Sequence, residues 1–340
     1  MPFSTTSTAP VTDEIALPTF ADIEVAAKRI AGKAVVTPLL ESEELDKRIG
    51  ARVLIKPEVL QRTGSFKFRG AYNRISQIPE RERAKGVVAY SSGNHAQGVA
   101  AAAQLLGLPA TIVMPSDAPA IKQANTKGYG AEIVLYDRYS GSRDAVADEV
   151  VKRTGGTLVR PFDDAGIVAG QGTCGLEIAR QAAERGAKLD ALLVNCGGGG
   201  LIGGSALAMR ALSPETKVYA VEPEGFDDTA RSLAAGERLT NDPSARSICD
   251  ALLSPSPGAL TFALNSRLLA GGLAVSDRQV IEAIAYAFRV LKLVVEPGGA
   301  VTLAALLSGA FDTHGKTVAI VLSGGNVDPE AFRSYLNAVG

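Results

Sequence analysis

The chain has 340 residues, 46% of them hydrophobic and 21% charged, and its formal net charge is −1 at pH 7. A chain of this length and composition is long enough for two globular domains, or for one large domain with an inserted lobe. The balanced charge excludes a general attraction to nucleic acid or to anionic membranes, so any anion site must be built locally.

The three cysteines are too few and too far apart for a disulfide framework or a CxxC zinc site. They fit a reducing compartment, and we expect a cytoplasmic protein. The polar first 14 residues lack the apolar centre of a signal peptide and are expected to form a frayed tail. No apolar run approaches the length of a transmembrane helix, so no membrane contact is expected.

Apolar β-branched segments alternate with segments of helical periodicity along most of the chain, which predicts an α/β fold with mostly parallel sheets. Small-residue turns follow three of the expected strands, at the strand ends where open α/β sheets bind ligands. The expected strands are Arg52–Lys56, Val87–Tyr90, Ala110–Met114, Glu132–Leu135, Leu192–Asn195, Lys217–Val221 and Thr317–Leu322. The expected helices are Asn94–Leu106, Ser142–Arg153, Ile178–Arg185, Asp277–Leu293 and Ala300–Ser308.

The segment Thr63–Gly70, which reads TGSFKFRG, places Lys67 between two phenylalanines with Arg69 close by. Partial desolvation and a neighbouring cation lower the pKa of a lysine and make its amine nucleophilic, as Schiff-base chemistry requires. On these residues alone, the alternative is a solvated lysine at the start of a helix that buries the phenylalanines.

The turn Ser91-Ser92-Gly93-Asn94-His95 precedes an expected helix. Exposed backbone N–H groups at that point can bind the carboxylate of a substrate. The alternative is ordinary helix capping by Ser92 or Asn94, with His95 in a structural polar contact.

Four consecutive glycines, Gly197 to Gly200, lie between an expected strand and an expected helix. Without side chains, their N–H groups can converge on one anion at the positive end of the helix, which predicts a phosphate cradle. A tight turn with close helix–sheet packing is one alternative. A dinucleotide site is another, since Gly198, Gly200 and Gly203 satisfy GxGxxG and Glu222 follows Gly203 by 19 residues.

The turn Ser323-Gly324-Gly325-Asn326 closes the last expected strand. Either the Ser323 hydroxyl faces a ring atom of a ligand, or the segment is a plain strand-to-helix turn.

Seven motifs, in this order between Thr19 and Asp328, resemble those of fold-type II pyridoxal-phosphate (PLP) enzymes: SFKFRGA, SSGNHAQG, AGQGT, GGGGLIGG, VEPE, EPGGA and SGGNVD. The nearest group is that of the threonine/serine dehydratases and serine racemases. The resemblance implies two open, twisted, mostly parallel sheets flanked by helices, as in the tryptophan synthase β fold. It also implies a large PLP-binding domain (residues 1–84 and 167–340), a small inserted domain (85–166) and a homodimer.

The resemblance also assigns roles to residues. Lys67 would carry PLP and act as the general base, and Ser92 would act on the opposite face of the substrate. The implied cofactor-binding residues are Phe66, Lys67, Asn94, Gly197, Gly198, Gly199, Gly200, Leu201 and Ser323. The implied substrate-binding residues are Ser91, Ser92, Asn94, His95 and Arg143, where Arg143 would meet a second substrate carboxylate unless it is a solvent-facing helix residue.

A divalent cation (Mg²⁺, Ca²⁺ or Mn²⁺) is implied at Glu222, the backbone carbonyl of Phe226, and Asp228. Oxygen ligands suit these cations. The alternative is a solvated acidic loop. One departure from the family is Cys249-Asp250-Ala251, where Ala-Asp-Gly is usual.

The resemblance implies a dehydratase, that is, an ammonia-lyase, which converts a small β-hydroxy amino acid such as threonine or serine to a 2-oxo acid and ammonia. The alternatives are a 3-hydroxyaspartate dehydratase giving oxaloacetate and ammonia, a serine racemase and, remotely, an NAD-dependent oxidoreductase. A non-catalytic PLP-binding protein is a further class. Because the sequence ends at Gly340, without a regulatory domain after SGGN, we expect a catabolic enzyme.

Overall fold

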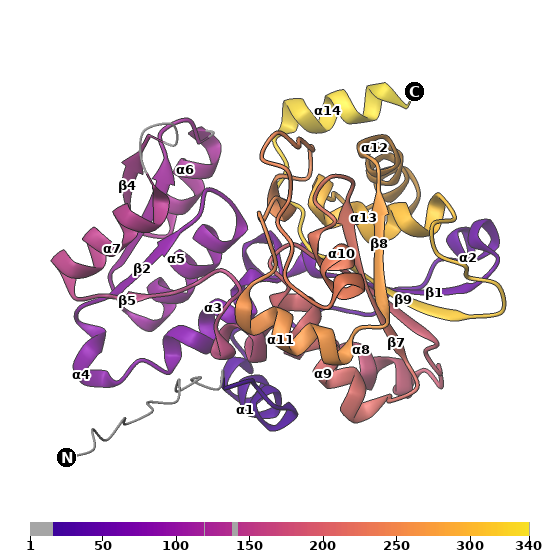
Figure 1. The fold of residues 1–340 in the computed structure, drawn as a ribbon, viewed down its shortest axis with the longest axis horizontal. Helices are drawn as coiled ribbons and strands as arrows, with labels where there is room; N and C mark the ends of the chain where they lie inside the picture. The colour runs from indigo at the N-terminus through magenta and orange to yellow at the C-terminus, as the bar shows by residue number, and fades with distance from the viewer. Residues whose placement is uncertain (1–15, 119, 138–141, 340) are drawn as a thin grey trace, which may run out of the picture.

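The computed structural model describes residues 16–118, 120–137 and 142–339, and the expected N-terminal frayed tail lies outside these ranges. Two parallel β-sheets lie next to each other, each with helices packed on its faces (Figure 1). The prediction of an α/β fold with two mostly parallel, helix-flanked sheets is confirmed. Within the described ranges, no helix combines the length and the apolar character needed to cross a bilayer.

The larger sheet has five strands in the order β1-β9-β6-β7-β8, all paired in parallel. Strands β1 and β9, which are adjacent in this sheet, come from opposite ends of the chain, and Arg52 of β1 pairs with Thr317 of β9. Both ends of the chain are therefore needed to complete this sheet. The strands are β1 (Arg52–Pro57), β6 (Ala191–Asn195), β7 (Lys217–Pro223), β8 (Gly271–Val275) and β9 (Thr317–Leu322).

The smaller sheet has four parallel strands in the order β4-β3-β2-β5. All four strands fall within residues 85–166, the range expected for the inserted lobe. The exact division of the chain at residues 84 and 166 stays a prediction. The strands are β2 (Val87–Tyr90), β3 (Ala110–Pro115), β4 (Glu132–Tyr136) and β5 (Thr157–Leu158).

Helices cover both sheets (Figure 1). Those nearest the N-terminus are α1 (Phe20–Ile30), α2 (Glu43–Ile49), α3 (Lys67–Ser76), α4 (Glu80–Arg83), α5 (Asn94–Leu106), α6 (Ala120–Gly128) and α7 (Arg143–Thr154). The later ones are α8 (Ala165–Glu184), α9 (Gly200–Leu212), α10 (Asp228–Ala235), α11 (Ala259–Leu268), α12 (Asp277–Tyr286), α13 (Pro297–Leu307) and α14 (Pro329–Ala338). Short 3₁₀ turns are η1 (Glu58–Leu60), η2 (Arg62–Gly64) and η3 (Asp250–Leu252), and η4 (Ala287–Leu291) is a π-helical turn.

Helix α8 begins 13 residues before the helix expected at Ile178–Arg185. Its first half is rich in glycine, which lowers helix propensity and hid it from the sequence pattern. A Cβ on Gly170 would lie 2.6 Å from Gly70 of α3, and one on Gly172 would lie 2.9 Å from the backbone of Gly204 in α9. The glycines therefore let α3 and α9 pack closely against α8.

The expected helix Asp277–Leu293 is also corrected. The α-helical part ends at Tyr286 and continues as the π-helical turn η4, after which Lys292 adopts a left-handed conformation with φ of 59° and ends it. Strands β5 and β8 were not expected from the sequence. The first has only two residues, and the second begins with two glycines, which weaken a strand pattern.

Four charged side chains form a buried network beneath the start of α3. The guanidinium of Arg69 donates twice to Glu58, at 2.7 Å each, and twice to Glu177, at 2.7 and 2.8 Å. Lys56 Nζ donates to the carboxylate of Glu177 at 2.7 Å. Arg69, Lys56 and Glu58 are fully buried, and their charges are paired within the network. Bidentate arginine–carboxylate pairs fix geometry, so this network anchors the segment that carries Lys67.

Candidate active site

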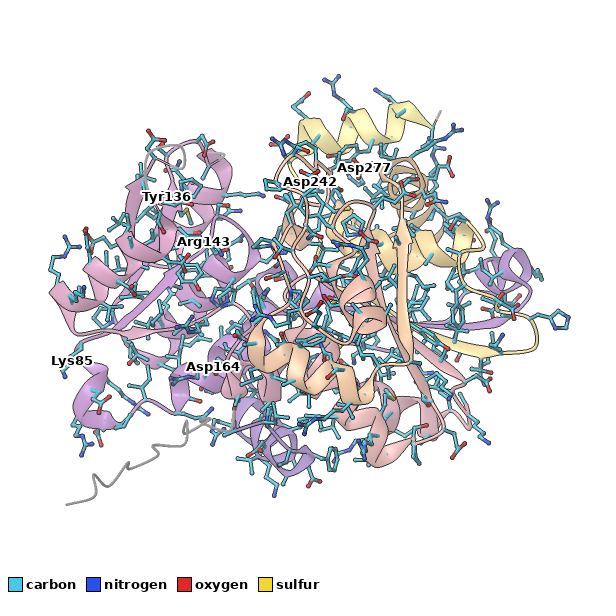
Figure 2. All side chains as sticks on the ribbon, in the orientation of Figure 1. Lys85, Tyr136, Arg143, Asp164, Asp242 and Asp277 are labelled. Atoms are coloured by element: carbon cyan, nitrogen blue, oxygen red, sulfur yellow. The ribbon has the colours of Figure 1, made fainter. Side chains whose placement is uncertain are left out.

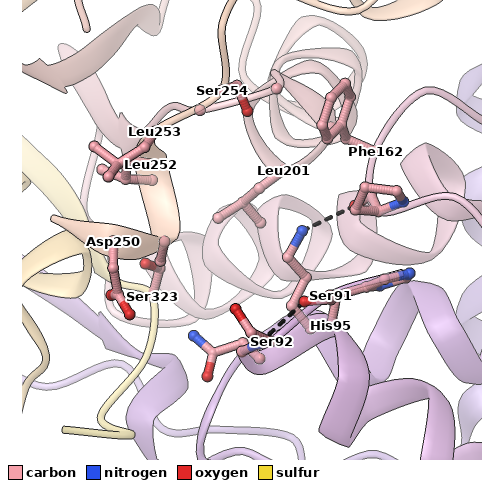
Figure 3. Close-up of a pocket in the computed structure, with 18 of the residues that line it drawn as sticks. Ser91, Ser92, His95, Phe162, Leu201, Asp250, Leu252, Leu253, Ser254 and Ser323 are labelled. Carbon is pink, nitrogen blue, oxygen red and sulfur yellow. Dashed lines mark hydrogen bonds between the residues drawn. The ribbon is translucent and has the colours of Figure 1, made fainter. Parts of the chain in front are cut away.

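A cavity of about 440 Å³ lies where the turns after β2, β6 and β9 meet. Figure 3 shows Ser91, Ser92 and His95 on the α5 side of this cavity, with Asp250, Leu252 and Leu253 opposite. Every residue expected to bind the cofactor or the substrate lines it: Phe66, Lys67, Ser91, Ser92, Asn94, His95, Arg143, Gly197, Gly198, Gly199, Gly200, Leu201 and Ser323. Three turns far apart in the sequence thus form one site.

Lys67 is the first residue of α3 and is half-buried in the cavity wall. Its Nζ donates to the carbonyl oxygen of Pro161 at 2.8 Å and lies 5.2 Å from the ring centre of Phe66. Burial lowers the pKa of the amine from 10.5 to about 8. A substantial fraction is therefore neutral and nucleophilic near that pH, which a fully solvated lysine would not be.

The glycine turn leads directly into α9. Gly199 precedes the helix in a left-handed conformation with φ of +88°, and no described side chain caps the helix end. A Cβ on Gly198 would lie 2.2 Å from the ring of Phe162, so glycine is also required there by packing. Close packing is thus present at this turn. It is compatible with a phosphate cradle, which stays a prediction, because bare N–H groups at the positive end of a helix can bind an anion.

These features fit PLP, which needs an amine for its aldehyde and a separate site for its phosphate. The amine of Lys67, with its lowered pKa, and the uncapped N-terminus of α9 face the same cavity. The hydroxyl of Ser65, two residues before the lysine, is buried and lacks a hydrogen-bond partner among the described residues. The residues present are thus compatible with the cofactor.

A chain of side-chain amides fixes the orientation of Asn94. Asn326 Nδ2 donates to the carbonyl oxygen of Thr63 at 2.7 Å and to Asn94 Oδ1 at 2.8 Å. Because a carbonyl can only accept, Asn326 must present its amino group there, and Asn94 is fixed in turn. Asn94 Nδ2 then donates to Glu296 Oε1 at 2.5 Å, so its amino group points toward Glu296. Sequence reasoning missed the roles of Asn326 and Glu296, although both lie in the quoted SGGN and EPGGA motifs.

Glu296 is buried in the cavity wall, only 4% exposed. Burial, followed by the charge of Asp250, raises the pKa of its carboxyl from 4.5 to about 8. The folded protein therefore keeps this proton between about pH 4.5 and 8, where the unfolded chain releases it.

We expect the stabilisation linked to this proton to be complete below pH 4.5 and to be lost as the pH rises through about 8. Within this window, the unfolding free energy should fall by about 1.4 kcal/mol for each unit by which the pH rises. Denaturant unfolding at a series of pH values should show a flatter profile for Glu296→Gln. Glu43→Gln, which alters an exposed glutamate, is the control and should follow the unsubstituted protein. Equal slopes for Glu296→Gln and the unsubstituted protein would contradict the assignment.

His95 lies in the first turn of α5 and contacts the carbonyl oxygen of Val159 through Nε2 at 2.9 Å. That nitrogen must carry the hydrogen, because the carbonyl accepts. Burial, followed by the charge of Lys67, lowers the pKa of His95 to about 3, so the ring is neutral. Its Nδ1 is buried and has no partner within the described parts of the chain. The structural contact expected as the alternative is present, and the ring also lines the cavity.

Arg143 begins α7 and is half-exposed, yet it lines the cavity. Figure 2 labels it on the part of the chain that carries the four-stranded sheet. Its guanidinium lies 5.0 Å from the ring centre of Tyr90. A second cation, Lys122 of α6, forms an ion pair with Asp250 of η3, and both of these residues line the cavity. Nothing in the sequence pattern singled out Lys122, because its pairing depends on the approach of two segments 128 residues apart.

The expected metal ligands lie outside the cavity, at the end of β7 and the start of α10. Glu222 and Asp228 are fully buried, which excludes the solvated acidic loop. Burial and the charge of Asp228 raise the pKa of Glu222 to about 8, and Asp228 Oδ2 has no partner among the residues described. The carboxylate of Glu222 accepts from the N–H groups of Thr229 and Ala230, so it does not face a ribose in the cavity. The dinucleotide interpretation is therefore not supported.

Comparison with known proteins agrees with this site. The family described as "Pyridoxal-phosphate dependent enzyme" matches residues 30–324. An L-threo-3-hydroxyaspartate ammonia-lyase of Pseudomonas sp is 45% identical over 94% of this chain and 99% of its own. A serine racemase of Schizosaccharomyces pombe is 41% identical over 96% of this chain and 100% of its own. The crystal structure of a threonine deaminase from T.th. superposes with a TM-score of 0.86, at 46% identity, over 92% of this chain and 99% of that one.

The family match covers Lys67, the turns after β2 and β6, and the start of the turn after β9. The relatives include both of the groups that the sequence motifs resembled. The predicted relationship to fold-type II PLP enzymes is confirmed. Since the family match spans residues 30–324, the chain belongs to the pyridoxal-phosphate dependent enzyme family.

Proposed function

We propose that this protein is a PLP-dependent ammonia-lyase that converts a small β-hydroxy amino acid to a 2-oxo acid and ammonia. The observation that carries the proposal is the amine of Lys67, with its pKa near 8, in the same cavity as the uncapped glycine turn of α9. Relatives with ammonia-lyase names support the reaction class. When bound, PLP supplies an electron-withdrawing ring that makes the α-hydrogen of an attached amino acid acidic.

Lys67 is proposed to carry the cofactor and then, once free, to take the α-proton as general base. A base whose pKa lies near the working pH is suited to this step. The N–H groups of Gly197 to Gly200 and of Leu201 would hold the phosphate, and Phe66 would pack against the ring. Asn94 would donate a hydrogen bond to the ring hydroxyl.

Ser323 is proposed to face the ring nitrogen, and it is nearly buried at the end of β9. An uncharged hydroxyl at this position would not hold that nitrogen protonated as an aspartate would, which would suit elimination of a β-hydroxyl.

The substrate carboxylate is proposed to bind at the N-terminus of α5, against Ser91, Ser92, Asn94 and His95. Ser91 Oγ accepts from the N–H of Gly93 at 3.1 Å, which shapes the turn for this purpose. Ser92 lines the same cavity as Lys67 and is proposed to act on the opposite face of the substrate. Serine racemase activity is therefore a second candidate, supported by the racemases among the relatives.

Two kinds of substrate are candidates: threonine or serine, and 3-hydroxyaspartate, whose side chain carries a second carboxylate. Arg143 at the cavity and the Pseudomonas relative favour the dicarboxylic substrate, whose product would be oxaloacetate. The test is 2-oxo acid and ammonia release from L- and D-threonine, L- and D-serine, and the 3-hydroxyaspartate isomers, with and without Mg²⁺. Turnover of one of these supports the lyase. Silence across the panel, with PLP bound, would reject the substrate class.

A divalent cation is proposed at Glu222, Asp228 and the carbonyl of Phe226. The unpartnered, buried oxygen of Asp228 supports it, since two close buried carboxylates need a positive partner.

Removing the cation with EDTA is expected to lower the unfolding free energy. Restoring Mg²⁺, Ca²⁺ or Mn²⁺ at a hundredfold its dissociation constant should recover about 2.7 kcal/mol. Thermal unfolding with and without each cation measures this, and Asp228→Asn should abolish the response. Identical melting curves under all conditions would reject the site.

We also propose that the protein is a cytoplasmic homodimer. A homodimer is supported by exposed Val25, Val35 and Val36 beside a groove of about 310 Å³ lined by α1 and α8. A cytoplasmic location is supported by three free, buried cysteines. Closure of a lobe formed by residues 85–166 on the substrate is proposed from the position of the cavity. Superposed free and ligand-bound structures without lobe movement would count against it.

A further inference from the structure

An ion pair between Lys122 and Asp250 lies in the cavity lining and joins segments that accompany different sheets. Lys122 lies on α6, which follows β3 of the four-stranded sheet. Asp250 lies in η3, between β7 and β8 of the five-stranded sheet. Both side chains line the cavity, and Asp250 is labelled in Figure 3. No step proposed above uses either of them.

The two partners are unequally hydrated. The side chain of Asp250 is 53% exposed, whereas that of Lys122 is 19% exposed. A carboxylate that keeps half of its hydration gains little from such a pair, and it can return to water at a cost of about 1 kcal/mol or less. A mostly enclosed ammonium has less access to water, so it needs an anion in the cavity. The aspartate is therefore the replaceable partner.

The other charges around the cavity leave room for an incoming anion. Glu296, the second carboxyl in the lining, is held in its neutral form by burial up to about pH 8, so it does not compete for Lys122. Arg143 adds a second positive charge over Tyr90. One substrate carboxylate can use the N-terminus of α5, and a second carboxylate would meet positive charge on the α6 and α7 side.

We infer that Lys122 is a specificity-determining residue that exchanges Asp250 for a second carboxylate on the side chain of the substrate. The inference rests on the proposed function and deepens it, because it selects β-hydroxy amino acids with a side-chain carboxylate over threonine and serine. Asp250 keeps the ammonium paired until such a substrate arrives. A substrate without that carboxylate leaves the Lys122–Asp250 pair in place.

The test uses the PLP-loaded protein and two matched probes, succinate and butanoate, whose binding is measured by calorimetric titration. Succinate should bind about tenfold more tightly, because hydrogen bonds to charged groups contribute about 1.5 kcal/mol or more. Lys122→Met should remove most of this preference. Asp250→Asn should strengthen succinate binding about threefold, because it removes a competitor worth about 1 kcal/mol or less. Lys47→Met, which alters an exposed lysine on α2, is the control.

The opposite signs of the two effects separate exchange from a purely structural clamp. If the pair only held two parts of the chain together, both substitutions would weaken succinate binding, and that result would overturn the inference. Unchanged preference in Lys122→Met would overturn it as well. Lys122→Met should likewise lower the ratio of kcat/KM for 3-hydroxyaspartate to that for serine, and Asp250→Asn should raise it.

The proposed function is judged separately, by 2-oxo acid release. Turnover of threonine or serine without any preference for succinate would leave the lyase standing and reject the exchange. A succinate preference that depends on Lys122, together with silence across the β-hydroxy amino acids, would support the exchange and reject the lyase.

Discussion

Replacing Lys67 with alanine is expected to lower kcat/KM for the preferred β-hydroxy amino acid by at least about 10³-fold. The variant loses both the covalent attachment of the cofactor and the general base, and a positioned base alone contributes about 10² to 10⁴. The amine that is lost lies 2.8 Å from the carbonyl of Pro161, with a pKa near 8. Release of 2-oxo acid measures the effect. The visible absorbance of lysine-bound PLP should disappear at the same time.

Two controls accompany this variant. Lys67→Arg keeps a positive charge but cannot bond covalently to the cofactor, so its loss should be comparable. Lys47→Ala alters a lysine side chain that is 81% exposed and should leave both activity and absorbance unchanged. If Lys67→Ala kept more than about a tenth of the activity, the assignment of this lysine would be wrong.

Replacing Arg69 with methionine is expected to lower the unfolding free energy by about 3 to 5 kcal/mol. The guanidinium pairs with Glu58 and Glu177 at 2.7 Å, so its loss leaves carboxylates uncompensated in the interior. Lys56 still pairs with Glu177, but the fully buried Glu58 loses its ion-pair partner. Denaturant unfolding followed by circular dichroism measures the change.

Arg52→Met provides the matched control, because Arg52 pairs with Glu41 at a similar distance of 2.8 Å but at the surface. An exposed pair contributes about 1 kcal/mol or less, so the two arginine variants should differ clearly. Arg69→Lys should fall between them, since lysine keeps the charge but loses the bidentate contacts. Equal losses for the two methionine variants would show that burial of the network has no special effect.

Much of the fold and of the site could be predicted from local sequence. The β-branched runs at β2 and β9, and the period of α5, gave element boundaries that the structure reproduces. The glycine run before α9 and the small-residue turns after three strands marked residues that line the cavity. These signals are local, because they arise from backbone conformation and from the alternation of apolar residues.

The groups that surround those motifs could not be predicted in the same way. The glycine-rich first half of α8 was not expected to be helical, and its close contacts with α3 and α9 appear only in the folded chain. The neutral state of Glu296 depends on burial, and the orientation of the Asn94 side-chain amide depends on Asn326, 232 residues away.

Sequence alone therefore determined the fold class, the cofactor family and a first set of cavity residues. The fold class follows from the alternation of apolar patterns, and the other two follow from short motifs. Tertiary structure decided the protonation states and the partners of the charged groups. The pKa of Lys67, the buried Arg69 network and the Lys122–Asp250 pair all depend on desolvation and on segments that meet only in the folded chain. Those quantities follow from distance and burial, which no local pattern records.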